Sequence, residues 1–231
     1  MTKITASEVN NLRKISGAGI MDCKNALVEA NGDTEAAIEI LRKKGQKVAA
    51  KRADRESSEG AAIAKVSSDN STGVIISLNC ETDFVAKNES FVSLANELAE
   101  LAISHETLDD FLKCQIDSMT VSEKLIQQTG VIGEKLVIGN FEKVSAGYVG
   151  KYIHAGNKIA TLVGFSKSVE GIEEASKNVA MQAAAMNPIA LDEDGVDQKT
   201  IEKEIEIAKD QLRQEGKPEA MLDNIAKGKL K

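Results

Sequence analysis

The sequence predicts an α+β fold with a helical beginning, a mixed core and a helical end. Apolar residues follow helical spacing up to about residue 45, alternate as in strands from Gly60, and return to helical spacing after Pro188. The order strand, turn, strand, helix occurs twice in between, about 85 residues apart, which indicates an internally duplicated core. With 231 residues, 42% of them hydrophobic and 28% charged, the chain can build such a core.

Residues 1–45 are predicted to form a compact module of three short helices. In the first helix, Val9, Leu12 and Ile15 mark one apolar face. The signals that bound the helices are the capping-box pair Thr5 and Glu8, the Asn31-Gly32 stop and the cap at Asp33. Three helices in so short a segment favour a small bundle.

A basic run follows, and residues 46–59 are predicted to form a linker that ends at the hinge Ser57-Ser58-Glu59-Gly60. Two interpretations of the run from Arg42 to Arg55 are open. It could be a patch that meets RNA or an acidic partner, or a hydrated helix end whose positive charge suits the helix C-terminus.

The core is predicted as two subdomains, residues 60–145 and 146–190. Each begins with two strands joined by a turn and continues into a helix. The predicted strands are 62–66 and 73–78 in the first unit, 148–153 and 158–163 in the second, and a further strand lies near 135–144. The helix of the second unit is expected from about Gly171 to Met186.

Residues 191–231 are predicted to form a helical hairpin with a coiled-coil seam. Ile201, Ile205, Ala208 and Leu212 are spaced four, three and four apart, with charged residues between them. The break at Gly216-Lys217-Pro218 separates this helix from a second amphipathic one. The seam could pack within its own domain or pair with a second copy of the chain.

Composition and charge exclude several classes of protein. The net charge of −7 disfavours a dedicated nucleic-acid binder, which needs a surplus of Lys and Arg. The three Cys residues are scattered, so neither disulfides nor a zinc site is expected. The chain has no long apolar run and no signal-peptide core, so we expect a cytoplasmic protein without a membrane segment.

The sequence offers little catalytic chemistry. It contains neither the G-x-x-x-x-G-K-[ST] nor the G-x-G-x-x-G phosphate-binding motif, so no nucleotide, metal or other cofactor is expected to bind. His105 and His154 are the only imidazoles. A Cys80–His pair would suit a small cysteine-dependent enzyme, but no local pattern favours it. A catalytic enzyme is therefore disfavoured.

The segment from Asn79 to Asn88 is unusual because it places Phe84 in a polar connection between a buried strand and a helix. Two interpretations are open on physical grounds. Phe84 could fold back into the core while Asp83 caps a helix, or it could protrude as a binding contact, as residues on loops of rigid scaffolds often do.

Two segments resemble signatures of the elongation factor Ts family. Residues 12–24 (LRKISGAGIMDCK) are similar to its N-terminal signature, and residues 79–88 (NCETDFVAKN) are similar to its second one. The segments 154–158 and 179–185, with Asn187-Pro188, fit the duplicated core of that family. The resemblance runs along the whole chain. It implies a guanine-nucleotide exchange factor for elongation factor Tu, with a ubiquitin-associated-like N-terminal module and a C-terminal coiled-coil hairpin.

The resemblance also implies site residues. Thr82, Asp83, Phe84 and Val85 would enter the GTPase near its Mg²⁺ site, where Asp83 and Phe84 would act as a wedge that dislodges the ion and promotes GDP release. The further contacts implied are Leu12, Arg13 and Met21 on the N-terminal module and Gly133 and His154 on the core.

This chain departs from the family pattern at two points. Ile20 stands where family members commonly have Met, an apolar exchange that should preserve contact. Family chains also continue past the region of Lys231, so the C-terminal part that completes the second core subdomain is expected to be missing here.

Overall fold

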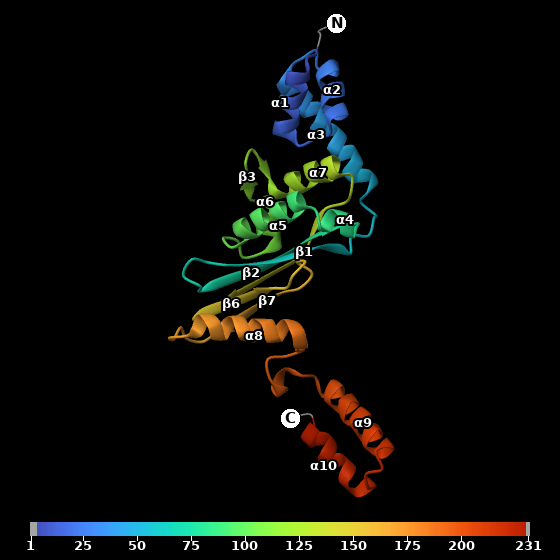
Figure 1. The fold of residues 1–231 in the computed structure, drawn as a ribbon, viewed down its shortest axis with the longest axis vertical. Helices are drawn as coiled ribbons and strands as arrows, with labels where there is room; N and C mark the ends of the chain where they lie inside the picture. The colour runs from blue at the N-terminus through green and yellow to red at the C-terminus, as the bar shows by residue number, and fades with distance from the viewer. Residues whose placement is uncertain (1–3, 230–231) are drawn as a thin grey trace. The chain divides into compact units, whose positions relative to one another are not determined.

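The computed structural model describes residues 4–229 and confirms an α+β fold. It divides into two compact units, one ending at Ala185 and one beginning at Met186. The first unit holds the N-terminal helices and the antiparallel sheets, and the second is helical (Figure 1).

Three helices open the first unit: α1 (Ala6–Ser16), α2 (Ile20–Glu29) and α3 (Thr34–Lys51). The predicted caps are present, because Thr5 and Glu8 form both bonds of a capping box and the Asp33 side chain accepts the Ala36 N–H at 3.0 Å. Their core is apolar and contains Val9, Leu12, Cys23, Ala26, Leu27 and Ala37.

Helix α3 differs from the prediction, since it continues past residue 45 to Lys51 and takes up part of the expected linker 46–59. Residues 46–51 (QKVAAK) are mainly Lys, Gln and Ala, which favour helix. Gly45, which could have ended the helix, is buried against Gly130. A Cβ added to Gly130 would lie 2.4 Å from the Gly45 Cα atom, so the two backbones are in direct contact.

The central sheet has the order β1 (Glu59–Val66), β2 (Thr72–Cys80), β5 (Val137–Ser145), and both pairs are antiparallel. The connection from β2 to β5 contains α4 (Asp83–Ala86), α5 (Glu89–Ala102), α6 (Leu108–Lys113), β3 (Gln115–Ile116), β4 (Met119–Thr120) and α7 (Val121–Ile132). Figure 1 shows α5 and α7 on one side of the sheet. Ile76, Leu78, Phe91 and Leu98 are fully buried between sheet and helices.

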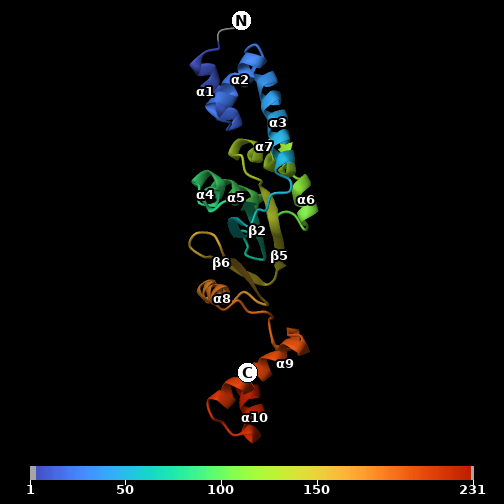
Figure 2. The same ribbon diagram turned by 90° about the vertical axis from the view of Figure 1, so that its right-hand side faces the viewer.

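The second strand pair, β6 (Tyr148–Ile153) and β7 (Ala160–Phe165), lies on the opposite side of the sheet and leads into α8 (Ile172–Met186) (Figure 2). Two backbone hydrogen bonds join it to the first pair, from Ala62 N–H to the Asn157 oxygen at 2.8 Å and from Val149 N–H to the Asn70 oxygen at 2.6 Å. The predicted order strand, turn, strand, helix is thus found twice in the structure.

The second unit contains the 3₁₀ turn η1 (Glu193–Gly195) and the helices α9 (Gln198–Gln214) and α10 (Glu219–Lys229). The two helices pack through Leu212, Leu222 and Ala226, flanked by Ile205, Ala208 and Ile225. Three of the predicted seam positions belong to this cluster, whereas Ile201 does not. Lys209 Nζ also contacts the Asp223 carboxylate across the two helices at 2.8 Å.

No helix among residues 4–229 combines the length and the apolar character needed to span a bilayer.

Candidate functional site

The segment around Phe84 forms a one-turn helix, α4, that projects from the end of β2. Thr82 caps it, since its hydroxyl oxygen accepts the Val85 N–H at 3.4 Å. The Phe84 side chain is 85% exposed, whereas Ala86 is buried and Val85 packs against the core. The core-plug interpretation of Phe84 is therefore wrong. The polar connection contains a helical turn, and its cap is Thr82 and not Asp83, which is the first residue of α4.

Asp83 lies beside Phe84 in the first turn of α4, with its carboxylate held on the surface. Lys87 Nζ donates to Asp83 Oδ2 at 2.6 Å. This hydrogen bond and the charge of Lys87 hold the pKa of Asp83 below its usual value, with a smaller contribution from Lys158. Asp83 is therefore ionised at neutral pH. The tip of α4 accordingly presents one bare aromatic ring next to one carboxylate, and we use "tip" for residues 82–85.

A second carboxylate, that of Glu134, holds the base of the tip. Its Oε2 atom accepts the backbone N–H groups of Glu81 and Thr82 at 3.1 and 3.0 Å, and its Oε1 atom accepts the Thr82 hydroxyl at 2.7 Å. Glu134 follows Gly133, which ends α7 in a left-handed conformation with φ of 83°. Sequence analysis did not find Glu134, because it lies far from Thr82 along the chain.

The Glu81 side chain in turn contacts the segment that carries Glu134. Its Oε1 atom accepts the backbone N–H of Lys135 at 2.7 Å, and both carboxylate oxygens lie 2.8 Å from Arg52 Nη1. The Lys135 N–H contributes most to holding the pKa of Glu81 below its usual value, and Arg52 adds to the effect. Arg52 follows the last residue of α3, so the base of the tip is also joined to that helix.

Cys80 lies directly beneath this arrangement and is fully buried. Its thiol donates to the Thr82 carbonyl oxygen at 3.2 Å. Burial, with a contribution from Glu134, raises the pKa of Cys80 to about 11. A nucleophilic cysteine must be a thiolate, and Cys80 stays protonated at neutral pH. Its burial and raised pKa therefore argue against Cys80 as the nucleophile of a cysteine-dependent enzyme.

The N-terminal candidates separate into buried and exposed residues. Leu12 has no exposed surface and belongs to the core of the three helices, so its prediction as a direct contact is wrong. Arg13 and Met21 are exposed, as are Ile15 and Ile20. Ile15 was expected on the buried face, but Ser16 takes the buried position in the last turn of α1 and Ile15 is exposed. These exposed side chains flank the turn between α1 and α2.

The two remaining candidates lie on the core. Gly133 caps α7, and its N–H donates to the Thr129 oxygen at 2.9 Å. His154 is exposed in the turn between β6 and β7, where its Nδ1 atom lies 2.9 Å from the Tyr152 hydroxyl. Their role as partner contacts stays a prediction.

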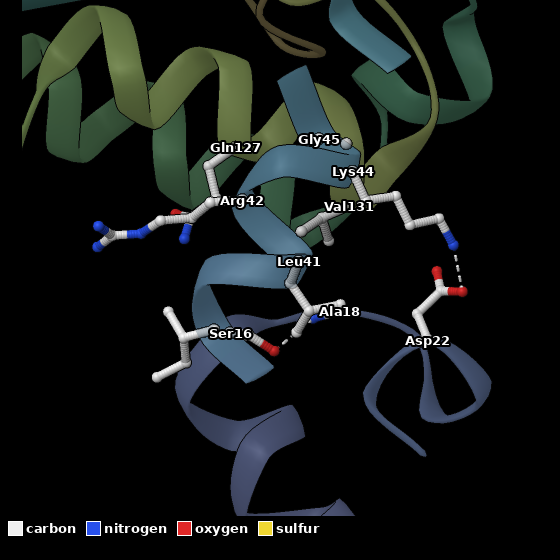
Figure 3. Close-up of a pocket in the computed structure, with 11 residues that line it drawn as sticks. Ser16, Ala18, Asp22, Leu41, Arg42, Lys44, Gly45, Gln127 and Val131 are labelled. Carbon is white, nitrogen blue, oxygen red and sulfur yellow. Dashed lines mark hydrogen bonds and ion pairs between the residues drawn. The ribbon is translucent and has the colours of Figure 1, made fainter. Parts of the chain in front are cut away.

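The basic run is partly neutralised within the chain. Lys43 pairs with Glu39 at 2.8 Å and Arg52 pairs with Glu81. Lys44 reaches Asp22 beside a small cleft between the N-terminal helices and α7 (Figure 3). These pairs favour the hydrated-helix interpretation over an RNA surface. The cleft has a volume of about 30 Å³, room for one water molecule and not for a nucleotide.

Within residues 4–229, no cluster of three or more His, Cys, Asp and Glu side chains is arranged to hold a metal ion. The tip presents a protruding aromatic ring and a carboxylate on a hydrogen-bonded base, which is suited to contact with another macromolecule.

Comparison with known proteins gives a consistent family assignment. A family model described as elongation factor TS matches residues 81–231. Elongation factor Ts of Christiangramia forsetii is 69% identical over 230 residues, which cover 100% of this chain and 84% of the relative. Elongation factor Ts of Flavobacterium psychrophilum is 66% identical with the same coverage, and that of Amoebophilus asiaticus is 50% identical over 98% of this chain and 83% of its own length.

Proposed function

Since this chain belongs to the elongation factor Ts family, and so to the factors of translation elongation, we propose that it releases GDP from elongation factor Tu. In this proposal it acts by binding and not by catalysis. The observation that carries the proposal is the exposed Phe84 beside the ionised Asp83 on a rigidly based turn. Inserted near the Mg²⁺ site of the GTPase, the ring would separate packed elements while the carboxylate would disturb the ion.

The energetics of exchange require no proton transfer. A nucleotide bound with nanomolar affinity is held by about 12 kcal/mol. Mg²⁺ accounts for part of this because it bridges and neutralises the phosphate oxygens. An exchange protein binds the nucleotide-free GTPase more tightly than the nucleotide-bound form. Because linkage is reciprocal, the affinity of the GTPase for nucleotide falls by the same ratio when the exchange protein is bound. Abundant GTP then refills the site and displaces the factor.

The remaining parts of the chain are assigned within this proposal. Residues 1–45 form a ubiquitin-associated-like module that contacts the partner through Arg13 and Met21, whereas Leu12 supports that surface from within. Residues 60–145 and 146–190 form two core subdomains, with Gly133 and His154 facing the partner. The helices of 191–231 form a coiled-coil hairpin, through which an oligomer could form. The protein works in the cytoplasm and binds no nucleotide itself.

The test is release of fluorescent GDP from purified elongation factor Tu. We expect the protein to accelerate release, and the double variant Asp83→Ala with Phe84→Ala to lose the effect by about tenfold or more, because both wedge groups are removed. Val169→Ala is the matched control, since Val169 is also an exposed apolar residue but lies away from the tip.

If the double variant exchanges as fast as the wild type, the wedge assignment is wrong. If the wild type fails to accelerate release, the exchange function itself is wrong. The second candidate, RNA binding by the run from Arg42 to Arg55, would show a strongly salt-dependent affinity for RNA.

A further inference from the structure

We propose that Glu81 and Glu134 are positioning residues that set the orientation of the tip, an assignment that rests on the exchange function proposed above. Each carboxylate binds the backbone of the segment that carries the other. Glu134 binds the N–H groups of residues 81 and 82, and Glu81 binds the N–H group of residue 135. We call this reciprocal arrangement the carboxylate brace.

On its Glu134 side, the brace reaches directly into α4. The Thr82 hydroxyl donates its proton to Glu134 Oε1 at 2.7 Å, which leaves its oxygen oriented to accept the Val85 N–H. One carboxylate therefore fixes the direction of the cap, and the cap fixes the first turn of the helix. Without Glu134, the Thr82 hydroxyl would be able to rotate away and two backbone N–H groups would lose their acceptor.

On its Glu81 side, the brace is connected to the rest of the molecule. Arg52 Nη1 donates to both oxygens of the Glu81 carboxylate at 2.8 Å, a charge-assisted contact that holds this side chain in place. The Lys135 ammonium group donates to the carbonyl oxygens of Ala53 and Arg55 at 2.7 and 3.1 Å, which fixes the chain just after α3. Leu136 N–H donates to the buried Thr129 hydroxyl at 3.1 Å and fixes the segment to α7. The carboxylate brace is thus connected to the C-terminal end of α3 and to α7.

The tip needs such support because its apolar packing is limited to Val85, which is partly buried against the core. A helix of one turn is unstable in isolation, since its nucleation cost is not repaid by further hydrogen bonds. The Phe84 ring contributes almost no burial, and in α4 only Ala86 is buried. A wedge must also resist the force that it transmits. A carboxylate that accepts several N–H and O–H groups provides this rigidity with directional, charge-assisted bonds.

The first test uses the protein alone and measures amide hydrogen exchange by NMR. We expect Glu134→Ala to speed exchange at the amides of Val85, Ala86, Lys87 and Asn88 by about tenfold or more, which corresponds to about 1.4 kcal/mol. Glu134→Gln should lie between the variant and the wild type, because its amide oxygen can still accept N–H groups but carries no charge. Glu142→Ala, on the exposed side of β5, is the matched control.

The second test measures GDP release at saturating factor. Glu134→Ala is expected to lower the maximal rate about tenfold, while the factor concentration at half-maximal rate changes by less than about threefold, because the N-terminal contact surface is intact. Glu134→Gln should restore part of the maximal rate. A purely structural role would not separate the two quantities in this way.

Two results would overturn the assignment. One is unchanged exchange at the amides of residues 85–88 in Glu134→Ala, and the other is faster exchange spread equally over β2, α5 and residues 85–88, which would indicate general destabilisation. If the wild type does not release GDP, the proposed function fails, but the amide measurement still decides whether the brace holds the tip.

Discussion

The N-terminal surface and the tip both expose apolar side chains, but the two are built in opposite ways. Met21 is 62% exposed and lies on helices whose caps and core come from neighbouring residues in the chain. Phe84 is supported by polar side chains that lie far from it in sequence, chiefly Glu134. An apolar core thus suffices to hold a broad contact surface, whereas a narrow projection requires directional hydrogen bonds.

The largest loss of stability is expected from a substitution in the apolar core of the N-terminal helices. Leu12→Ala should destabilise the three-helix module by about 3 kcal/mol, because it leaves a cavity among fully buried side chains. Chemical denaturation followed by helical circular dichroism would measure the loss. Met21→Ala is the control, with an expected change within about 0.5 kcal/mol. A cost below about 1 kcal/mol for Leu12→Ala would contradict the assignment of Leu12 to the core.

At the base of the tip, the substitution that corresponds to Leu12→Ala removes a polar contact. Arg52→Ala should cost about 1.5 kcal/mol, because it removes a charge-assisted contact from a Glu81 side chain that is only 16% exposed. The loss should appear as faster amide exchange at the tip and after α3, with the core of α1 and α2 unaffected. Lys47→Ala, which removes an exposed cation within α3, is the control. Equal effects of the two substitutions would show that the pair with Glu81 is not special.

A smaller effect is expected from the capping box at Thr5. Thr5→Ala removes the side-chain acceptor for the Glu8 N–H and should cost about 1 kcal/mol, confined to the N-terminal module. Thermal unfolding would measure it. Thr5→Ser is the control, since it keeps the hydroxyl and should be nearly neutral. A change in tip exchange on Thr5→Ala would mean that the two regions are less independent than their contacts indicate.

The smallest effect is expected from pH. The pKa of Glu81 is lowered in the folded protein, so its stabilising contribution is present above its ordinary value of 4.5 and is lost as the pH falls through the lowered value. Tip protection, corrected for the intrinsic pH dependence of amide exchange, should therefore decrease below about pH 4.5. The variant Glu81→Gln should show a weaker dependence. Identical profiles for variant and wild type would exclude Glu81 as the titrating group.

The sequence was sufficient to predict what depends on local pattern. Helical and strand spacing located most elements of the core, and the caps at Thr5 and Asp33 were correctly identified. Helix α4 was missed because four residues are too few to show a period. The pairing of Glu134 with Thr82 was missed because it depends on how α7 and β2 meet in space. Resemblance pointed to Leu12 as a contact, and only its burial corrected this.

The contact between Gly45 and Gly130 gives α3 a mechanical role. At this crossing the backbones of α3 and α7 touch, so their spacing is set by main-chain atoms and not by adjustable side chains. The same helix carries the N-terminal core at one end and leads to Arg52 at the other. Helix α3 is therefore a rigid spacer between the N-terminal surface and the tip. A Cβ at Gly130 would lie 2.4 Å from the Gly45 Cα atom and would push the two helices apart, whereas a Cβ at Gly45 would make only ordinary contacts of 3.6 Å or more.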